Sequence, residues 1–202
     1  MSGPTLAWSG RGRPVVRDEE SGRWRFGDRA PSQPSFVELR RHGPPLPDPS
    51  LLVHGEAHEA LRALLVTHAG RIRLCYIDPP FNTGQDFDAY ADRADHGVWL
   101  SCLEERVRAA VQLLCPGAFF VAHLNVVEQS YLKVLLDEIF GRERLVAQIV
   151  WQRTPDRTVL GQGSALVADQ VEYLLVYSNG ALANDWPRPQ RITKLPTRTL
   201  LT

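Results

Sequence analysis

The residues in this chain that are best suited to chemistry follow an apolar run at 74–77 and read Asp78-Pro79-Pro80-Phe81. Each proline has a fixed φ angle and no N–H donor, so the segment presents carbonyl oxygens in a rigid array. Asp78 adds a carboxylate acceptor, and Phe81 offers a flat face on which a planar ring can stack. Together these groups suit an amino group on an aromatic heterocycle, and a nucleobase fits. A plain turn is the alternative, because Asp-Pro sequences also begin turns.

Helical and strand patterns alternate from residue 51 onward. Apolar residues recur at helical spacing in three segments, 56–70, 98–115 and 126–141. Short apolar runs predict strands at 71–77, 118–124, 145–152 and 171–178. This alternation predicts an α/β fold with a mostly parallel sheet and helices on both faces. Ligands in such sheets bind beyond the carboxyl ends of the strands, which is where Asp78 stands.

The stretch "LCYIDPPFNTG" at 74–84 resembles the catalytic motif of amino-group DNA methyltransferases. The flanking segments "LLVHGEAHEALRALL" and "WLSCLEERVRAAVQLLCPGAFFVAHLN", and the chain onward to "VEYLLVYSNG", extend the likeness over residues 51–180. In particular, they are similar to the modification subunits of type III restriction-modification systems. The resemblance implies a partial Rossmann-like fold dependent on S-adenosylmethionine. It also implies methyl transfer to the exocyclic amino group of a flipped base in double-stranded DNA, with adenine N6 preferred and cytosine N4 left open.

The resemblance also implies roles for single residues. Asp78 and the carbonyl oxygen of Pro79 would accept hydrogen bonds from the target amino group, and Pro80 would hold the loop in shape. Phe81 would stack on the extruded base. The substrate loop would continue through three further residues, Asn82, Thr83 and Gly84. No metal is expected, because the reaction is a direct displacement that depends on positioning and local electrostatics.

The sequence departs from the family pattern where the cofactor should bind. Relatives usually carry Gly-Asp-Asn where this chain has Gly55-Glu56-Ala57, so Glu56, together with Asp78, is the expected cofactor contact. The glycine-rich turn that holds S-adenosylmethionine would follow the catalytic motif, and no convincing candidate is present. The GxG matches at 10–12 and 161–163 are not flanked by a strand and a helix. The chain is therefore expected to be a C-terminally incomplete methyltransferase.

Three regions are expected from composition. Residues 1–50 hold eight of the fifteen prolines and are expected to be irregular, 51–180 form the catalytic half, and 181–202 form a basic tail. The tail is a possible start of a recognition region. Two other functions stay open: a non-catalytic remnant or one part of a split enzyme that binds DNA or a partner subunit, and a related transferase acting on RNA or a protein amide.

The remaining patterns indicate what the chain is not. The formal net charge is zero, so the total charge gives no sign of a nucleic-acid partner. His54 and His58 are four residues apart but lack further ligands for zinc. No apolar run is long enough to span a membrane, and a cytoplasmic location is expected. The acidic residues of the loop after the motif are expected to be solvated: Asp86, Asp88, Asp92 and Asp95.

Overall fold

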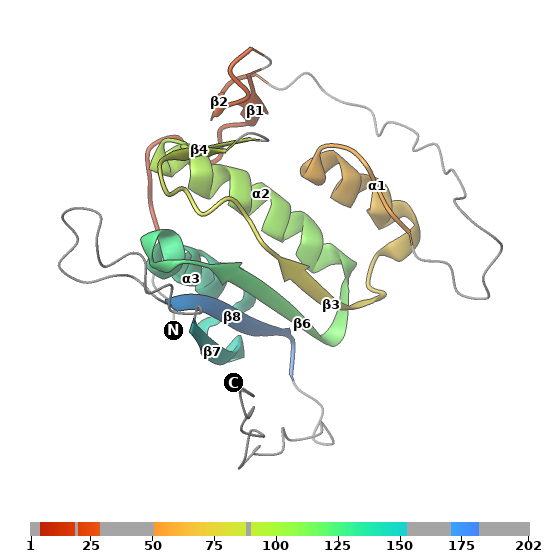
Figure 1. Cartoon of the computed structure of the whole chain (residues 1–202). Coiled ribbons are helices and arrows are strands. Elements are labelled where there is room, and N and C mark those ends of the chain that lie inside the picture. Colours follow the sequence, from red (N-terminus) through yellow and green to blue (C-terminus); the bar gives the residue numbers. More distant parts are fainter. Residues whose placement is uncertain (1–4, 19, 29–50, 88–89, 153–170, 182–202) are drawn as a thin grey trace, which may run out of the picture.

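A computed structural model describes residues 5–18, 20–28, 51–87, 90–152 and 171–181 of the chain (Figure 1). Its helices are α1 (Ala57–His68), α2 (His96–Leu113), α3 (Val126–Phe140) and the 3₁₀ turn η1 (Arg142–Arg144). Its strands are β1 (Val15–Arg17), β2 (Trp24–Phe26), β3 (Ile72–Ile77), β4 (Gln85–Phe87), β5 (Tyr90–Asp92), β6 (Leu114–Leu124), β7 (Leu145–Gln152) and β8 (Val171–Asn179). The elements expected from residue 51 onward are therefore present, and the α/β class is confirmed.

The main sheet has four strands in the order β3-β6-β8-β7. β3 and β6 are parallel, whereas β8 is antiparallel to both of its neighbours, β6 and β7. Three strands therefore point in one direction, as expected for a mostly parallel sheet, and β8 is reversed between two of them. The reversal brings the start of β8 beside the carboxyl ends of β6 and β3.

One face of the sheet carries the hydrophobic core. Alternate residues of β6 and β8 point toward α2 and α3, and the most deeply buried of them are Phe120, Ala122, Leu124, Leu175 and Tyr177. The Tyr177 hydroxyl donates a 2.6 Å hydrogen bond to Asp137 of α3, which ties that helix to the sheet. Burial and this hydrogen bond raise the pKa of Tyr177.

The opposite face is open among the described residues. Side chains that point this way stay largely exposed, including Leu74 (58%), Tyr76 (52%), Ile149 (48%) and Trp151 (60%). The expectation of helices on both faces is therefore wrong for this part of the chain. The connections β3–α2–β6 and β6–α3–β7 move in the same direction across the sheet. Right-handed crossovers of that kind place both helices on one face.

The segment expected to be irregular contains an ordered hairpin. β1 and β2 pair antiparallel, and Val15 packs against Val98 and Cys102 of α2. The indole of Trp8 donates a 2.8 Å hydrogen bond to Ser101. The N-terminal residues therefore join the fold at α2, and the hairpin lies above that helix in Figure 1.

A second difference lies just after the Asp-Pro-Pro-Phe segment. The expected long polar loop contains the short antiparallel pair of β4 and β5. Its end folds back on the catalytic segment, because the Gly84 N–H donates a 2.9 Å hydrogen bond to the Asp92 carbonyl. Gly84 has a φ of +80°, a conformation that glycine adopts without strain.

Candidate active site

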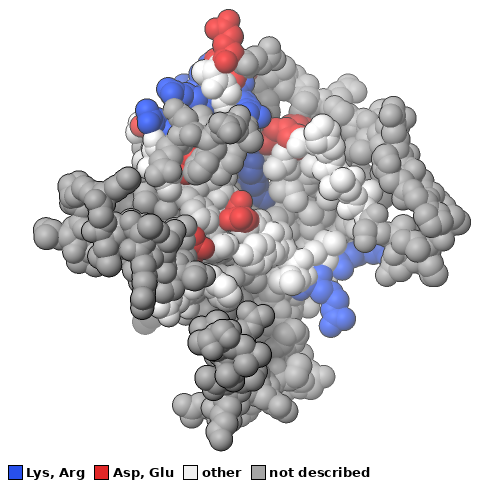
Figure 2. Space-filling view, viewed as in Figure 1, with Lys and Arg blue, Asp and Glu red and all other residues white. Residues whose placement is uncertain are grey.

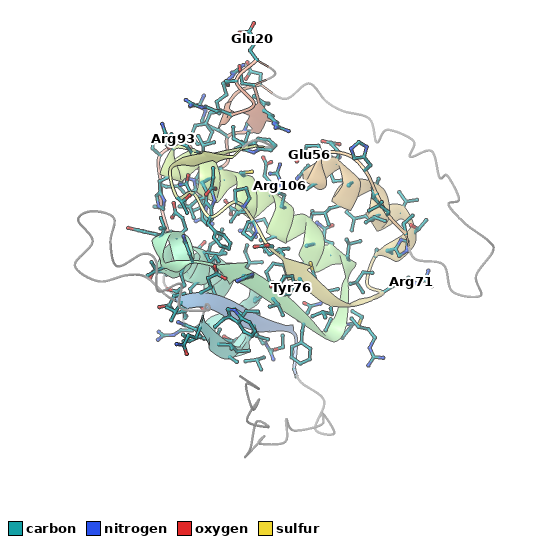
Figure 3. All side chains as sticks on the ribbon, in the orientation of Figure 1. Glu20, Glu56, Arg71, Tyr76, Arg93 and Arg106 are labelled. Carbon is teal, nitrogen blue, oxygen red and sulfur yellow. The ribbon has the colours of Figure 1, made fainter. Side chains whose placement is uncertain are left out.

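Asp78 lies just beyond the end of β3, at the carboxyl edge of the sheet, as expected. Its side chain is 62% exposed, so the carboxylate is available to a ligand. Tyr76, on the same face of β3, is labelled in Figure 3 beside β6 and β8. Burial and the nearby charges of Asp78 and Glu172 raise the pKa of Tyr76.

The two prolines after Asp78 are held from behind by α2. The indole Nε1 of Trp99 donates a 2.7 Å hydrogen bond to the carbonyl oxygen of Pro80. Phe81 packs against the hydrophobic core and meets the ring of His123 edge-on, with ring centres 5.6 Å apart. The loop thus has one hydrogen-bonded anchor and one packed anchor, which agrees with its expected rigidity.

Asn82 and Thr83 are held by a buried carboxylate. Asp92 is 2% exposed and accepts hydrogen bonds from the Asn82 N–H (2.8 Å), the Thr83 N–H (3.0 Å) and the Thr83 hydroxyl (2.6 Å). Asn82 has a φ of +58°, and its side-chain amide donates a 2.7 Å hydrogen bond to Glu128. These contacts hold the loop, so Asn82 and Thr83 have structural work beside any substrate contact.

The expectation of a solvated acidic loop is therefore wrong for Asp92. Its backbone pairing in β5 turns the side chain inward, toward the N–H groups of the catalytic loop. Asp95 is exposed but caps α2, where its carboxylate accepts a 2.9 Å hydrogen bond from Gly97. Asp88 lies outside the described residues, and the side chain of Asp86 is likewise not described.

A cavity of about 310 Å³ opens beside Asp78. Most of its wall is apolar, and two tryptophans from distant parts of the chain contribute to it. The lining residues are Trp24, Ile77, Asp78, Pro79, Pro80, Asn82, Asp92, Arg93, Ala94, Trp99, Cys102, Leu103 and Arg106. An apolar cavity with few polar groups is typical of small-molecule sites, and this volume is near the lower end of their range. Phe81 is not part of the wall.

Glu56 reaches this cavity only indirectly. One carboxylate oxygen pairs with Arg106, and the other accepts a 3.1 Å hydrogen bond from the Glu59 N–H at the start of α1. Burial alone would raise the pKa of Glu56, but the charge of Arg106 and the helix N–H groups outweigh it and lower the pKa. Arg106 stacks 4.6 Å from the ring centre of Trp24. Figure 3 labels Glu56 and Arg106 between α1 and α2.

His123 and Glu172 also belong to this edge, and the sequence reasoning missed both. The His123 ring lies between two carboxylates, with Nε2 2.8 Å from Glu172 and Nδ1 3.7 Å from Asp78. A polar residue near the end of the apolar run "AFFVAHL" was a usable signal for His123. No local signal marks Glu172, because only the pairing of β8 with β6 brings it here.

The described residues also limit other kinds of site. They contain no group of three or more His, Cys, Asp or Glu side chains that could hold a metal ion. None of the helices in the described part of the chain is long and apolar enough to cross a membrane. In the view of Figure 2, their basic side chains gather mainly over the N-terminal hairpin. The basic residues of the tail at 181–202 lie almost entirely outside the described residues.

The cavity fits part of S-adenosylmethionine. Two indoles can contact a planar ring, the Arg106 guanidinium can pair with a carboxylate, and Asp78 can face a positive charge. The expected glycine-rich turn has no counterpart among the described residues. The donor set present therefore fits the methionine and ring portions of such a molecule and supplies no dedicated turn.

Comparisons with known proteins agree on one family. A family model described as DNA methylase matches residues 72–198. The chain is 35% identical over 143 residues to a probable type III restriction-modification enzyme, the HindVI Mod subunit of Haemophilus influenzae, covering 70% of this chain and 19% of that protein. It is 31% identical over 155 residues to the type II methyltransferase M.KpnI of Klebsiella pneumoniae, covering 72% and 36%.

A solved structure shares part of the arrangement. The DNA modification methylase TTHA0409 of Thermus thermophilus, in complex with S-adenosyl-L-methionine, aligns with a TM-score of 0.47 and 16% identity. The alignment covers 68% of this chain and 57% of that one. The chain spans only 19% and 36% of the lengths of the two relatives matched by sequence.

Proposed function

This chain belongs to the DNA methylase family, and on that premise we propose that it supplies the catalytic groups for methyl transfer from S-adenosylmethionine to an exocyclic amino group in DNA. The observation that carries the proposal is the position of Asp78. Its exposed carboxylate lies at the carboxyl edge of the sheet, on a loop held by Trp99, and it lines the apolar cavity. Restriction-modification is the proposed setting, because the matched relatives carry that name or act as modification methyltransferases.

Asp78 and Pro79 are the proposed acceptors for the target amino group. Hydrogen bonds to a carboxylate and a carbonyl draw the nitrogen lone pair out of conjugation with the ring and direct it outward. The rigid loop keeps both acceptors in place before the substrate arrives, so little reorganisation is needed during the reaction. Pro80 contributes by offering its own carbonyl to Trp99, which fixes the loop from the other side.

Phe81 remains the proposed stacking group for the flipped base. The rings in the cavity wall are Trp24 and Trp99, whereas Phe81 packs beside the cavity against the core and His123. Stacking on Phe81 would therefore bring the base to Asp78 from next to the cavity and would leave the cavity itself to the cofactor. Asn82, Thr83 and Gly84 would border the base as the substrate loop.

S-adenosylmethionine would supply an electrophilic methyl group when bound. Within this chain, Asp78, Arg106 and Trp24 are the proposed contacts for it. Glu56 is proposed to act through Arg106, since both of its oxygens already have partners. Further cofactor contacts and any partner subunit stay part of the proposal, because the chain spans a minor part of its relatives.

Adenine N6 is the proposed target atom. The support is the similarity to type III modification subunits, on which the preference over cytosine N4 rests. The non-catalytic alternative is less well supported, because Asp78, Pro79 and their supporting contacts are all in place. The same groups also favour a base amino group in DNA over a protein amide, given the family of the chain.

The test is methyl transfer to mixed-sequence duplex DNA. The chain, with radiolabelled S-adenosylmethionine, is expected to label the DNA, and mass spectrometry of the digested product is expected to find N6-methyladenine. Asp78→Ala should remove the label by at least about a hundredfold, the scale on which single transition-state hydrogen bonds act. Glu143→Ala, at an exposed site in η1, is the matched control. Full activity of the Asp78→Ala protein would overturn the mechanism, and N4-methylcytosine would overturn the target.

A further inference from the structure

His123 occupies the position behind the proposed catalytic carboxylate. It is the second-last residue of β6, and its side chain is 21% exposed. It is not part of the cavity wall, whereas Asp78 both lines the cavity and faces Nδ1 of His123 at 3.7 Å. A ligand amino group bound by Asp78 would therefore be linked to His123 through that carboxylate.

The strand register explains why these side chains meet. Tyr76 pairs with Val121 in β6, and His123 pairs with Leu174 in β8. Asp78 lies two residues beyond Tyr76, and Glu172 two residues before Leu174. Side chains two apart on a strand share a face, so all of them point to the open face of the sheet. Only the reversed direction of β8 allows Glu172 to reach the carboxyl edge.

The contacts of His123 determine how its two ring nitrogens are used. Nε2 lies 2.8 Å from the Glu172 carboxylate, and a carboxylate can only accept, so Nε2 carries a proton. In the neutral ring Nδ1 is then the free acceptor, and it is the nitrogen that faces Asp78. Histidines whose one nitrogen is held by a carboxylate have a fixed tautomer and ring orientation.

We propose that His123 is a positioning residue that acts through Asp78: Glu172 holds its ring so that Nδ1 faces the Asp78 carboxylate, orients it, and takes over the proton that the methylated amino group loses. The inference rests on the proposed function. The exposed Asp78 side chain closes the remaining 3.7 Å by rotation when a proton is shared. The other rings at His123 are those of Phe81 and Tyr76, centred 5.6 Å and 6.3 Å away.

The proton balance is simple. As the amino nitrogen forms its bond to the methyl carbon, the bond from that carbon to sulfur breaks and sulfur keeps the electron pair. The nitrogen then carries one proton too many. That proton passes to the Asp78 carboxylate and from there to Nδ1 of His123, which becomes an imidazolium between two carboxylates. Because the ring is partly exposed, it returns the proton to water, and no other reactant is required.

The first test does not depend on activity. Ring-nitrogen NMR of the chain should find His123 protonated on Nε2 and neutral at Nδ1 at alkaline pH. The midpoint of its titration should fall in both Asp78→Asn and Glu172→Gln, because each substitution removes a negative charge beside the ring. His68, at the end of α1, is the internal reference and should titrate unchanged. A His123 midpoint that ignores Asp78→Asn would overturn the proposal.

The second test measures single-turnover methyl transfer between pH 5.5 and 9. His123→Asn should lower the rate by about a hundredfold, within the usual range for proton transfer, without changing the KM for DNA. It should also flatten the acidic limb of the pH profile. Glu172→Gln should shift that limb, and His68→Asn should match the wild type. An unchanged rate and profile in a folded His123→Asn protein would overturn the role of His123 alone. A wild-type chain without transfer would count against the proposed function, and the NMR result would still decide whether His123 and Asp78 are coupled.

Discussion

The indole Nε1 of Trp99 lies 2.7 Å from the carbonyl oxygen of Pro80 and donates a hydrogen bond to it. Trp99 is 4% exposed and belongs to the hydrophobic core, so the bond connects the catalytic loop to the most rigid part of the molecule. The loop cannot shift along the sheet without breaking a buried hydrogen bond. Its geometry therefore depends on α2 as well as on its own prolines.

Trp99→Phe should destabilise the chain and impair the site together. It leaves the Pro80 carbonyl without its donor and loses ring volume, which should cost about 2 kcal/mol in urea unfolding. Trp8→Phe is a matched control, because it removes an equivalent 2.8 Å hydrogen bond to Ser101 away from the cavity. Both variants should lose stability, but only Trp99→Phe should reduce methyl transfer. Equal transfer by the two variants would mean that the anchor does not position the loop.

Asp92→Ala should unfold the chain more easily than its place in an acidic loop suggests. The substitution removes the acceptor of three hydrogen bonds to Asn82 and Thr83. Leaving such buried donors without partners should cost on the order of 3 kcal/mol. Asp95→Ala, which removes only the cap of α2, should cost about 1 kcal/mol. Chemical denaturation of both variants tests the order, and a larger loss at Asp95 would contradict it.

Glu104 should make the attachment of the N-terminal segment sensitive to acid. It pairs with Arg11 and Arg108, each at 2.8 Å. Burial alone would raise the pKa of Glu104, but the hydrogen bonds and charges of the two arginines outweigh it and lower the pKa below its ordinary value of 4.5. A lowered pKa in the folded state means that the contribution to stability is present at neutral pH and is lost as the pH falls below that value.

The measurement is the urea midpoint between pH 7 and pH 3. The wild-type midpoint should fall more steeply below pH 4.5 than that of Glu104→Gln, which lacks the titrating group. Glu143→Gln, whose side chain is 73% exposed, should follow the wild type. Identical slopes for wild type and Glu104→Gln would show that this pair adds nothing.

Trp24→Ala should weaken ligand binding in the cavity. Trp24 forms part of the wall and is held by the Arg106 guanidinium. Loss of one aromatic contact should lower the affinity for S-adenosylhomocysteine about tenfold, which corresponds to about 1.4 kcal/mol. Trp151→Ala is the control, because Trp151 is 60% exposed and lies outside the cavity wall. Calorimetric titration measures both, and an unchanged affinity of Trp24→Ala would remove the hairpin from the site.

Local patterns were enough to predict most of the elements that carry the site. Apolar spacing identified α2, α3 and the strands β3, β6, β7 and β8 to within a few residues, because one buried stripe or face imposes its period on the sequence. The same patterns could not predict the faces on which the helices pack. That depends on the order of the strands in space, and two crossovers in the same direction put α2 and α3 together.

The catalytic loop shows the same division. The sequence by itself determined that Asp78, Pro79 and Pro80 form a rigid set of acceptors after a strand, since proline geometry and side-chain chemistry are local properties. Only the tertiary structure decided what surrounds them. Trp24, Asp92 and Glu172 reach the loop through a hairpin, a short strand pair and a reversed strand, and such long-range pairings leave no periodic signal in the chain.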